Sequence, residues 1–355
     1  MSYTLLEIPS FKSSELLDTL SSLLLKKELL GLMNKEVETY KLYAVVDGAM
    51  DEEIDMNLEV YQASYVTLYP EAYSQAAGYA QPFLVEMDTS EEFARWFLSE
   101  SYGNHKGIFF FSTAGMDHLS EVLGSFCIGY MQEGHKETFF RFYDPKIFPA
   151  FLRMVSADQL ERLFGGQAVY VCENFITPQR LSLYRFDEEN ARLMQTTLDL
   201  TLPLDERVCK EETAYASMKP KAFYETPHQT LIFDRQDVAI LSQSRLYLHA
   251  KRAALSLQVQ HAPSKEEDFN TLYKVCFDLA HKGYALGLND ADANYLWIVA
   301  NRLHEGIEKL KSHQKYGKIF DMSGTITQTQ KAGLLEELVE ALEEKLSMNK
   351  EQENG

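Results

Sequence analysis

The stretch KLYAVVDG, residues 41–48, is a run of mostly apolar residues that ends in an aspartate and a glycine. A helical pattern, DEEIDMNLEVY (51–61), follows it, and then a second strand-like run, SYVTLY (64–69). Strands that alternate with helices are typical of an α/β layer. We therefore predict a sheet with flanking helices and at least some parallel pairing.

The same alternation extends in both directions from this stretch. On the N-terminal side, a serine-capped helix carries leucines on one stripe, at Leu16, Leu20, Leu23 and Leu24. On the C-terminal side the pattern predicts strands at 82–87 and 106–112, with helices at 90–100 and 116–124. Two short helices within 146–166 and two strands, 167–173 and 180–186, complete the layer.

A β-hairpin is predicted where FCIGYM (126–131) and ETFFRFY (137–143) flank a short polar loop with one glycine. Asp144-Pro145 then suits the start of a helix, with the aspartate as N-cap. If the strand continues through 139–143, its side chains alternate between two faces. One face receives Phe140 and Phe142, and the other receives Phe139, Arg141 and Tyr143.

Arg141 lies among these aromatic residues and needs a carboxylate partner if it is desolvated. Asp47 is the first candidate, because it ends the strand at 41–47, and Asp144 is the second. The planar guanidinium can bond a carboxylate with two donors while it stacks on a ring. We interpret Arg141 as a buried structural strut and keep direct recognition of a partner as the alternative.

The fold class that these patterns indicate is α/β, with a mixed-sheet N-terminal domain, flanking helices and an all-helical C-terminal domain. The first domain spans about 1–190. Regular periodicity is weak over 191–232, which we interpret as a connector, and amphipathic helices dominate 233–355.

The composition restricts the classes of partner. The 355 residues contain 34 Lys and Arg against 53 Asp and Glu, a formal net charge of −19, which disfavours nucleic acid and anionic membranes. No apolar run is long enough to span a membrane, so we expect a cytoplasmic protein without membrane insertion. The sequence holds no recognisable metal, cofactor or catalytic motif, and we expect no metal, no cofactor and no enzymatic activity.

Acidic residues recur at Asp47, Asp51 and Asp55, which could suggest a divalent cation. The better interpretation is a helix whose first turn is acidic, because the helix dipole favours negative charge there. The aromatic residues offer a separate signal. Most of them suit an α/β core, but four tyrosines without core periodicity could form a contact surface: Tyr69, Tyr73, Tyr79 and Tyr102.

Seven landmarks occur in the order seen in effector adaptors of type VI secretion systems, which the chain resembles over about residues 41–186. They are YAVVDGA (43–49), SYVTLY (64–69), QPFLVEM (81–87), RWFL (95–98), KGIFFFS (106–112), FFRFYDPKIF (139–148) and QLERLFGG (159–166). The most specific is FFRFYDPKIF. Residues 272–299 are similar to the helical extension that many members carry.

The resemblance implies a non-enzymatic adaptor that binds a secreted effector protein, a toxin, and helps load it onto the VgrG spike protein. Independently of the resemblance, the residues that we predict to have a structural or partner-binding role are Asp47, Tyr69, Tyr73, Tyr79, Arg141, Phe142, Tyr143 and Asp144. Two alternatives remain open. One is an enzyme of unrecognised class that uses Asp47, Arg141 and Asp144 in a cleft, and the other is a structural scaffold without a toxin client.

Overall fold

The computed structural model describes residues 14–132, 136–174, 179–204, 206–207, 210–216, 231–260, 269–303, 307–321 and 326–353. The chain divides into two compact units. The α/β unit falls within Pro9–Leu241, and the helical unit is formed by Ser242–Gly355. The predicted class, an α/β region with sheet and flanking helices followed by a helical region, is confirmed.

An eight-stranded sheet forms the α/β unit, and all of its neighbouring strands pair antiparallel. In sheet order the strands are β10 (Lys210–Ala216), β9 (Arg192–Asp199), β8 (Arg180–Asp187), β7 (Val169–Glu173), β4 (Gly107–Ser112), β1 (Lys41–Asp47), β3 (Pro82–Glu86) and β2 (Ser64–Thr67).

The antiparallel pairing corrects the parallel pairing expected for the strands between 41 and 112. Strands β1 and β2 do run in the same direction, because both are antiparallel to β3, but β3 lies between them. In the same way, β1 separates β3 from β4. The crossovers therefore interleave, as in split βαβ units, and the alternation of elements alone cannot reveal this.

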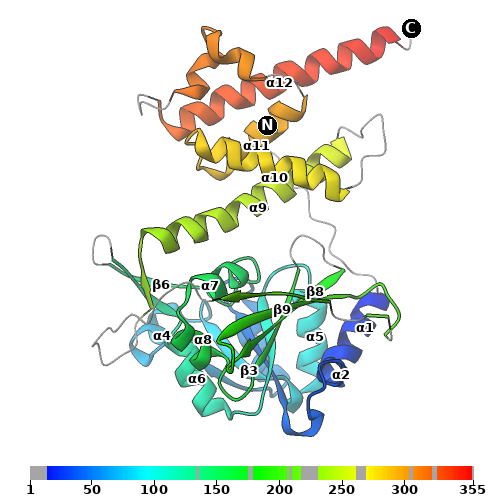
Figure 1. Cartoon of the computed structure of the whole chain (residues 1–355), viewed down its shortest axis with the longest axis vertical. Coiled ribbons are helices and arrows are strands. Elements are labelled where there is room, and N and C mark those ends of the chain that lie inside the picture. Colours follow the sequence, from blue (N-terminus) through cyan, green and yellow to red (C-terminus); the bar gives the residue numbers. More distant parts are fainter. Residues whose placement is uncertain are drawn as a thin grey trace. The chain divides into compact units, whose positions relative to one another are not determined.

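Strand β1 is buried on both faces, which explains its nearly continuous apolar sequence. One face contributes Leu42, Ala44 and Val46 to a core shared with several helices, and Tyr43 and Val45 face a second core. The first core is covered by α1 (Ser14–Leu25), α2 (Glu28–Leu32) and α5 (Glu91–Ser101), which are labelled in Figure 1. Helix α3 (Glu53–Val60) also contributes to it. The second is covered by α6 (Met116–Gly124), α7 (Phe148–Met154) and α8 (Ala157–Leu163).

A second sheet has three strands, β11 (Leu231–Phe233), β5 (Ile128–Met131) and β6 (Lys136–Phe139). Strands β5 and β6 form the predicted hairpin, and β11 pairs parallel with β5. The segment 191–232 is thus more than a connector, because it supplies β9, β10 and most of β11. The sequence of these strands does not alternate clearly between apolar and polar residues. In β9, for example, the buried positions are Leu193, Thr196 and Leu198, which are not evenly spaced.

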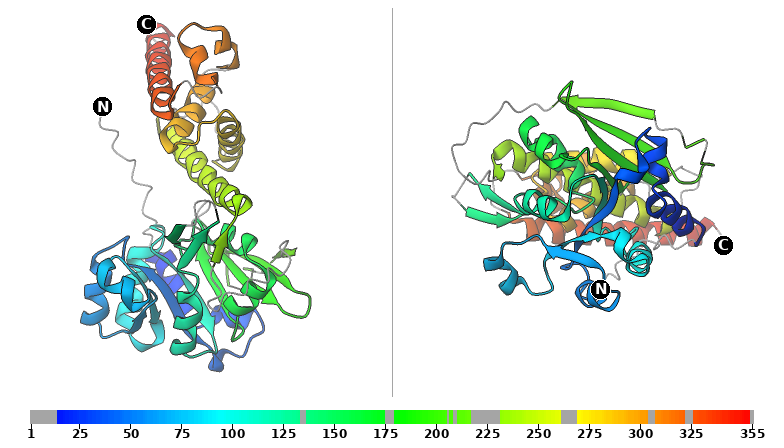
Figure 2. Two further views of the ribbon diagram at one scale, coloured as in Figure 1. Left: turned by 90° about the vertical axis from the view of Figure 1, so that its left-hand side faces the viewer. Right: turned by 90° about the horizontal axis from the view of Figure 1, so that it is seen from below.

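The helical unit contains α9 (Arg235–Gln260), which begins in the α/β unit, followed by α10 (Phe269–Ala285), α11 (Ala291–Leu303) and α12 (Gln328–Glu353). Short 3-10 helices lie at Ile307–Ser312 and Tyr316–Phe320. These elements are coloured from yellow-green to red in Figure 2. Within the described part of the chain, no helix combines the length and the apolar character that crossing a membrane requires.

Candidate functional site

Asp47 and Arg141 form an ion pair at the end of β1. The Nη2 group of Arg141 donates a hydrogen bond to Oδ2 of Asp47. Oδ1 of Asp47 accepts a second hydrogen bond from the backbone N–H of Ala49, at 3.1 Å. The predicted pairing is therefore confirmed.

The two members of this pair differ in exposure. The side chain of Asp47 is 1% exposed, whereas that of Arg141 is 38% exposed. The carboxylate is therefore the buried charge, and the guanidinium reaches it from the surface. The buried structural strut predicted for Arg141 is therefore only partly correct, because the arginine end of the pair is open to solvent.

Burial raises the pKa of Asp47, and the charge and hydrogen bond of Arg141 offset part of this rise. The negative charge of the nearby Asp144 also raises the pKa of Asp47. For Arg141, burial opposes the charged form, but the attraction of Asp47 prevails and raises the pKa of the guanidinium. The two groups are electrostatically coupled, and each favours the charged form of the other.

Asp144 does not cap a helix directly. Its Oδ1 accepts a hydrogen bond from the backbone N–H of Lys146 at 2.9 Å, and Nζ of Lys146 lies 3.6 Å from Oδ2. Helix α7 starts only at Phe148, with Ile147 as its N-cap. The predicted helix start is therefore too early, because the chain makes a turn at 142–147 first.

The predicted alternation through 139–143 is also wrong. Strand β6 ends at Phe139, and beyond it Phe142 and Tyr143 are both buried. Phe142 packs edge-on against Phe126, with ring centroids 6.1 Å apart. The two-residue period applies only while the chain stays extended, so the end of the strand removes it.

Tyr143 connects the ion pair to the surface aromatic residues. Burial and the nearby Asp47 raise its pKa well above the usual value. Burial raises the pKa of Tyr69 as well, and the neighbouring Tyr143 opposes part of this rise. Both hydroxyl groups therefore stay protonated at neutral pH and can act as hydrogen-bond donors.

Tyr69, Tyr73 and Phe139 form an aromatic cluster beside the ion pair. The ring of Phe139 lies 4.9 Å from that of Tyr69 and meets that of Tyr73 edge-on at 5.4 Å. The hydroxyl of Tyr73 donates to Oε2 of Glu137 at 2.9 Å. Phe139 nevertheless stays 52% exposed, so the cluster presents an aromatic face to solvent.

The four tyrosines predicted as a contact surface thus separate. Tyr69 and Tyr73 lie together, and Tyr73 belongs to helix α4 (Glu71–Ala77), a helix that the sequence patterns did not predict. Tyr79 is 51% exposed, and among the described residues its ring makes no contact with the cluster. Tyr102 is a core residue, 4% exposed.

Gly48 is a site residue that the sequence interpretation missed. Its N–H donates to the carbonyl of Gln81 at 3.1 Å. A Cβ at this position would lie 2.8 Å from the same oxygen and closer still to the carbonyl oxygen of Tyr79. The glycine after Asp47 is therefore required by close backbone packing, and the Asp-Gly pair itself was the available signal.

Another missed pair is His105 and Glu173. Oε1 of Glu173 contacts Nδ1 of His105, and Oε2 accepts a hydrogen bond from the backbone N–H of Gly103. Glu173 is 7% exposed, so these partners satisfy a buried carboxylate. Because the two side chains come from distant parts of the sequence, spacing could not reveal them.

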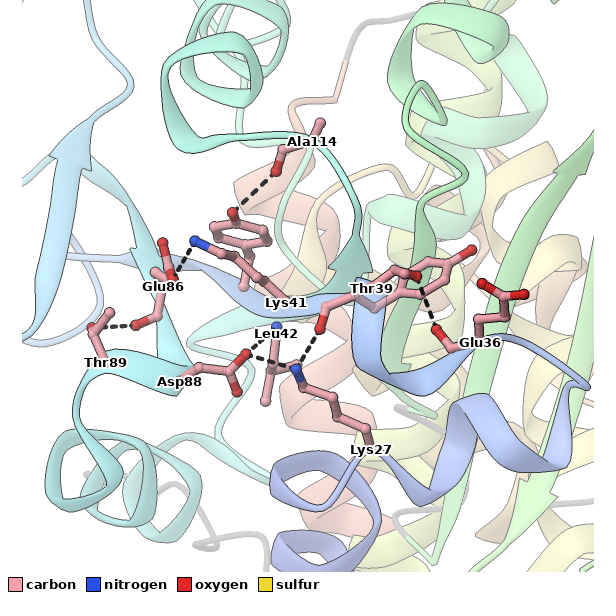
Figure 3. A network of polar contacts seen from close by, with 11 residues as sticks. Lys27, Glu36, Thr39, Lys41, Leu42, Glu86, Asp88, Thr89 and Ala114 are labelled. Carbon is pink, nitrogen blue, oxygen red and sulfur yellow. Dashed lines mark hydrogen bonds and ion pairs between the residues drawn. The ribbon is translucent and has the colours of Figure 1, made fainter.

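A polar network also anchors the start of β1, at the opposite end from Asp47 (Figure 3). Oδ2 of Asp88 accepts a hydrogen bond from the backbone N–H of Leu42 at 3.0 Å and pairs with Nζ of Lys27 at 3.1 Å. Lys41 pairs with Glu86 at 2.8 Å. These contacts join the α1–α2 turn, β1 and the end of β3, and we assign them a structural role.

The fold and site together define an α/β protein with an ion pair and an exposed aromatic cluster at one end of β1. Residues 42–162 match the family model described as "Domain of unknown function (DUF4123)". The match runs from β1 into α8 and includes every residue of the ion pair and the aromatic cluster. No curated protein and no solved structure matches the chain. The described residues also contain no group of three or more His, Cys, Asp or Glu side chains that could hold a metal ion.

Proposed function

We propose that this chain is a non-enzymatic adaptor that binds a type VI secretion effector in the bacterial cytoplasm and helps load it onto the VgrG spike. The proposal rests on the order of the seven sequence landmarks and is supported by the match of 42–162 to a domain family. It requires a surface for protein contact within that segment. The exposed aromatic cluster is the surface that we assign to this contact.

The exposed ring of Phe139 is the single observation that best supports a contact role. An aromatic side chain that is half exposed on a well-packed base, here Tyr69 and Tyr73, can bury a large apolar area on binding. Arg141 and the Tyr73 hydroxyl add polar groups nearby, as is common around interface centres. An enzymatic role for Asp47 and Arg141 has less support, because a substrate could reach only the guanidinium.

The test is co-expression of the full chain with the effector and spike proteins encoded beside its gene, followed by affinity purification and size-exclusion chromatography. We expect a stable complex and a higher soluble yield of effector. Phe139→Ala should weaken effector binding about tenfold or more, as expected for an aromatic anchor, with little change in melting temperature.

The matched control is Leu204→Ala, which removes another exposed apolar side chain, 42% exposed and outside the matched domain. It should bind like the wild type. If the effector is equally soluble alone and no complex elutes, the adaptor proposal is wrong. If the complex forms but Phe139→Ala and the control bind equally well, the contact surface lies elsewhere.

A further inference from the structure

Helix α3 presents two neighbouring apolar side chains to solvent. Met56 is 57% exposed and Val60 is 62% exposed. They stand four residues apart, so they form one ridge along the outer face of the helix. The opposite face is anchored in the first core by Ile54 and Leu58, which are fully buried. The exposed pair is therefore held by a fixed helix and contributes nothing to that core.

Glutamates border this ridge on both sides. Glu52, Glu53 and Glu59 are exposed. Every charged side chain between Lys41 and Arg95 is acidic, so no basic residue lies nearby in sequence. Burial, with smaller contributions from the negative charges of Glu59 and Asp55, raises the pKa of Tyr65 in strand β2.

These glutamates also lack counter-ions. Within the described part of the chain, no ion pair involves Glu52, Glu53 or Glu59, whereas other acidic side chains such as Glu91 and Asp199 pair with arginines. Acidic residues at the start of a helix are favoured by its dipole, which accounts for Glu52 and Glu53. Glu59 lies in the last turn of α3, where the dipole disfavours negative charge, so helix stability does not account for it.

We propose that the outer face of α3, formed by Met56, Val60, Glu52, Glu53 and Glu59, binds a basic amphipathic helix of a partner protein. The ridge of Met56 and Val60 would fit between apolar side chains of that helix, as ridges pack into grooves. Lysine or arginine side chains beside the apolar stripe would then meet the unpaired glutamates. The proposal uses no residue of the aromatic cluster and does not depend on the adaptor function.

The binding test uses the full chain and three synthetic 21-residue helical peptides. The probe carries leucines on one stripe and lysines beside it. One control peptide replaces the lysines by glutamates, and the other keeps the lysines but replaces the leucines by serines. We expect only the probe to bind with clear affinity in fluorescence anisotropy at physiological salt. Its lysines can pair with the glutamates, and its leucines can pack against Met56 and Val60.

Two sets of variants locate the site. Reversing the charges with Glu52→Lys, Glu53→Lys and Glu59→Lys together should weaken probe binding about tenfold or more. The matched control reverses three exposed glutamates elsewhere, with Glu161→Lys, Glu188→Lys and Glu189→Lys, and changes the net charge equally. It should weaken binding no more than about threefold, through long-range attraction alone.

Met56→Ser with Val60→Ser should abolish the preference for the leucine peptide over the serine peptide. Equal weakening by the two charge reversals would overturn the proposal, because binding would then follow net charge alone. Equal binding of the leucine and serine peptides to the wild type would overturn it as well. A concentration-dependent dimer that the Met56→Ser, Val60→Ser variant loses, without probe binding, would assign the face to a second copy of this chain instead.

Discussion

Replacement of Arg141 by alanine should destabilise the α/β unit substantially. Breaking a fully buried ion pair typically costs about 3–5 kcal/mol, and breaking an exposed pair costs about 0–1 kcal/mol. Here the carboxylate is 1% exposed and the arginine 38% exposed, so water can replace only part of the lost contact. We expect a loss of about 2–3 kcal/mol, which for a unit of this size lowers the melting temperature by roughly 5–10 °C.

The loss should depend on pH, because the buried carboxylate can escape its penalty by taking up a proton. Burial already raises the folded-state pKa of Asp47 above its value in the unfolded chain. Such a group contributes stability that is complete below the unfolded pKa and is lost as the pH rises through the folded pKa. Without Arg141 the folded pKa rises further, so the variant keeps losing stability at a higher pH than the wild type does.

Urea unfolding monitored by fluorescence at about pH 5 and about pH 8 tests this reasoning. The difference in free energy of unfolding between wild type and Arg141→Ala should be larger at the higher pH. In an Asp47→Asn background, which has no carboxylate to titrate, the same comparison should show a smaller and pH-independent difference. If Arg141→Ala lowers the free energy of unfolding equally at both pH values when Asp47 is present, the coupling between the two groups is refuted. Arg141→Lys should be more stable than Arg141→Ala but less stable than the wild type.

Two further predictions concern backbone packing and thiol reactivity. Gly48→Ala should lower the free energy of unfolding in urea by more than about 3 kcal/mol, because its Cβ would meet two backbone carbonyls. Gly31→Ala on α2 has free space around the new Cβ and should raise the free energy of unfolding by about 0.5–1 kcal/mol. Similar effects of the two substitutions would contradict the packing argument. Burial raises the pKa of the Cys127 and Cys172 thiols, so both should resist iodoacetamide in the native protein and react after denaturation, as followed by peptide mass spectrometry. Rapid native labelling of either thiol would show that its site opens.

The sequence was sufficient to predict most of the strands and helices around β1, though not α4, and the partner of Arg141. The pair could be predicted because an arginine among aromatic residues needs a carboxylate, and Asp47 stands at the end of a strongly apolar strand. The partial exposure of Arg141 could not be predicted, since it depends on where β6 ends and how the turn at 142–147 runs. The two-residue alternation of side chains predicts which face a residue occupies only within a strand, and it does not show where the strand ends.

Strand order was the other feature beyond reach of local patterns. The helices between β1 and β2, and between β3 and β4, look the same whether the joined strands are neighbours or enclose a third strand. The late strands β9 to β11 were missed for a related reason. They are short or irregular in pattern, and their place is set by pairing with residues far away in sequence.

Strand β11 has a consequence for protein synthesis. Leu231 pairs with Gly129, and the ring of Phe233 lies 4.8 Å from that of Phe140, so the small sheet gains its third strand only after about 100 more residues have been translated. At roughly 5–20 residues per second this takes on the order of 5–20 s. During that time the nascent β5–β6 hairpin has an open strand edge and uncovered aromatic rings, which are features that promote aggregation. A fragment that stops near residue 190 would keep this edge open permanently, so an N-terminal fragment must reach Phe233 to carry the complete set of paired strands.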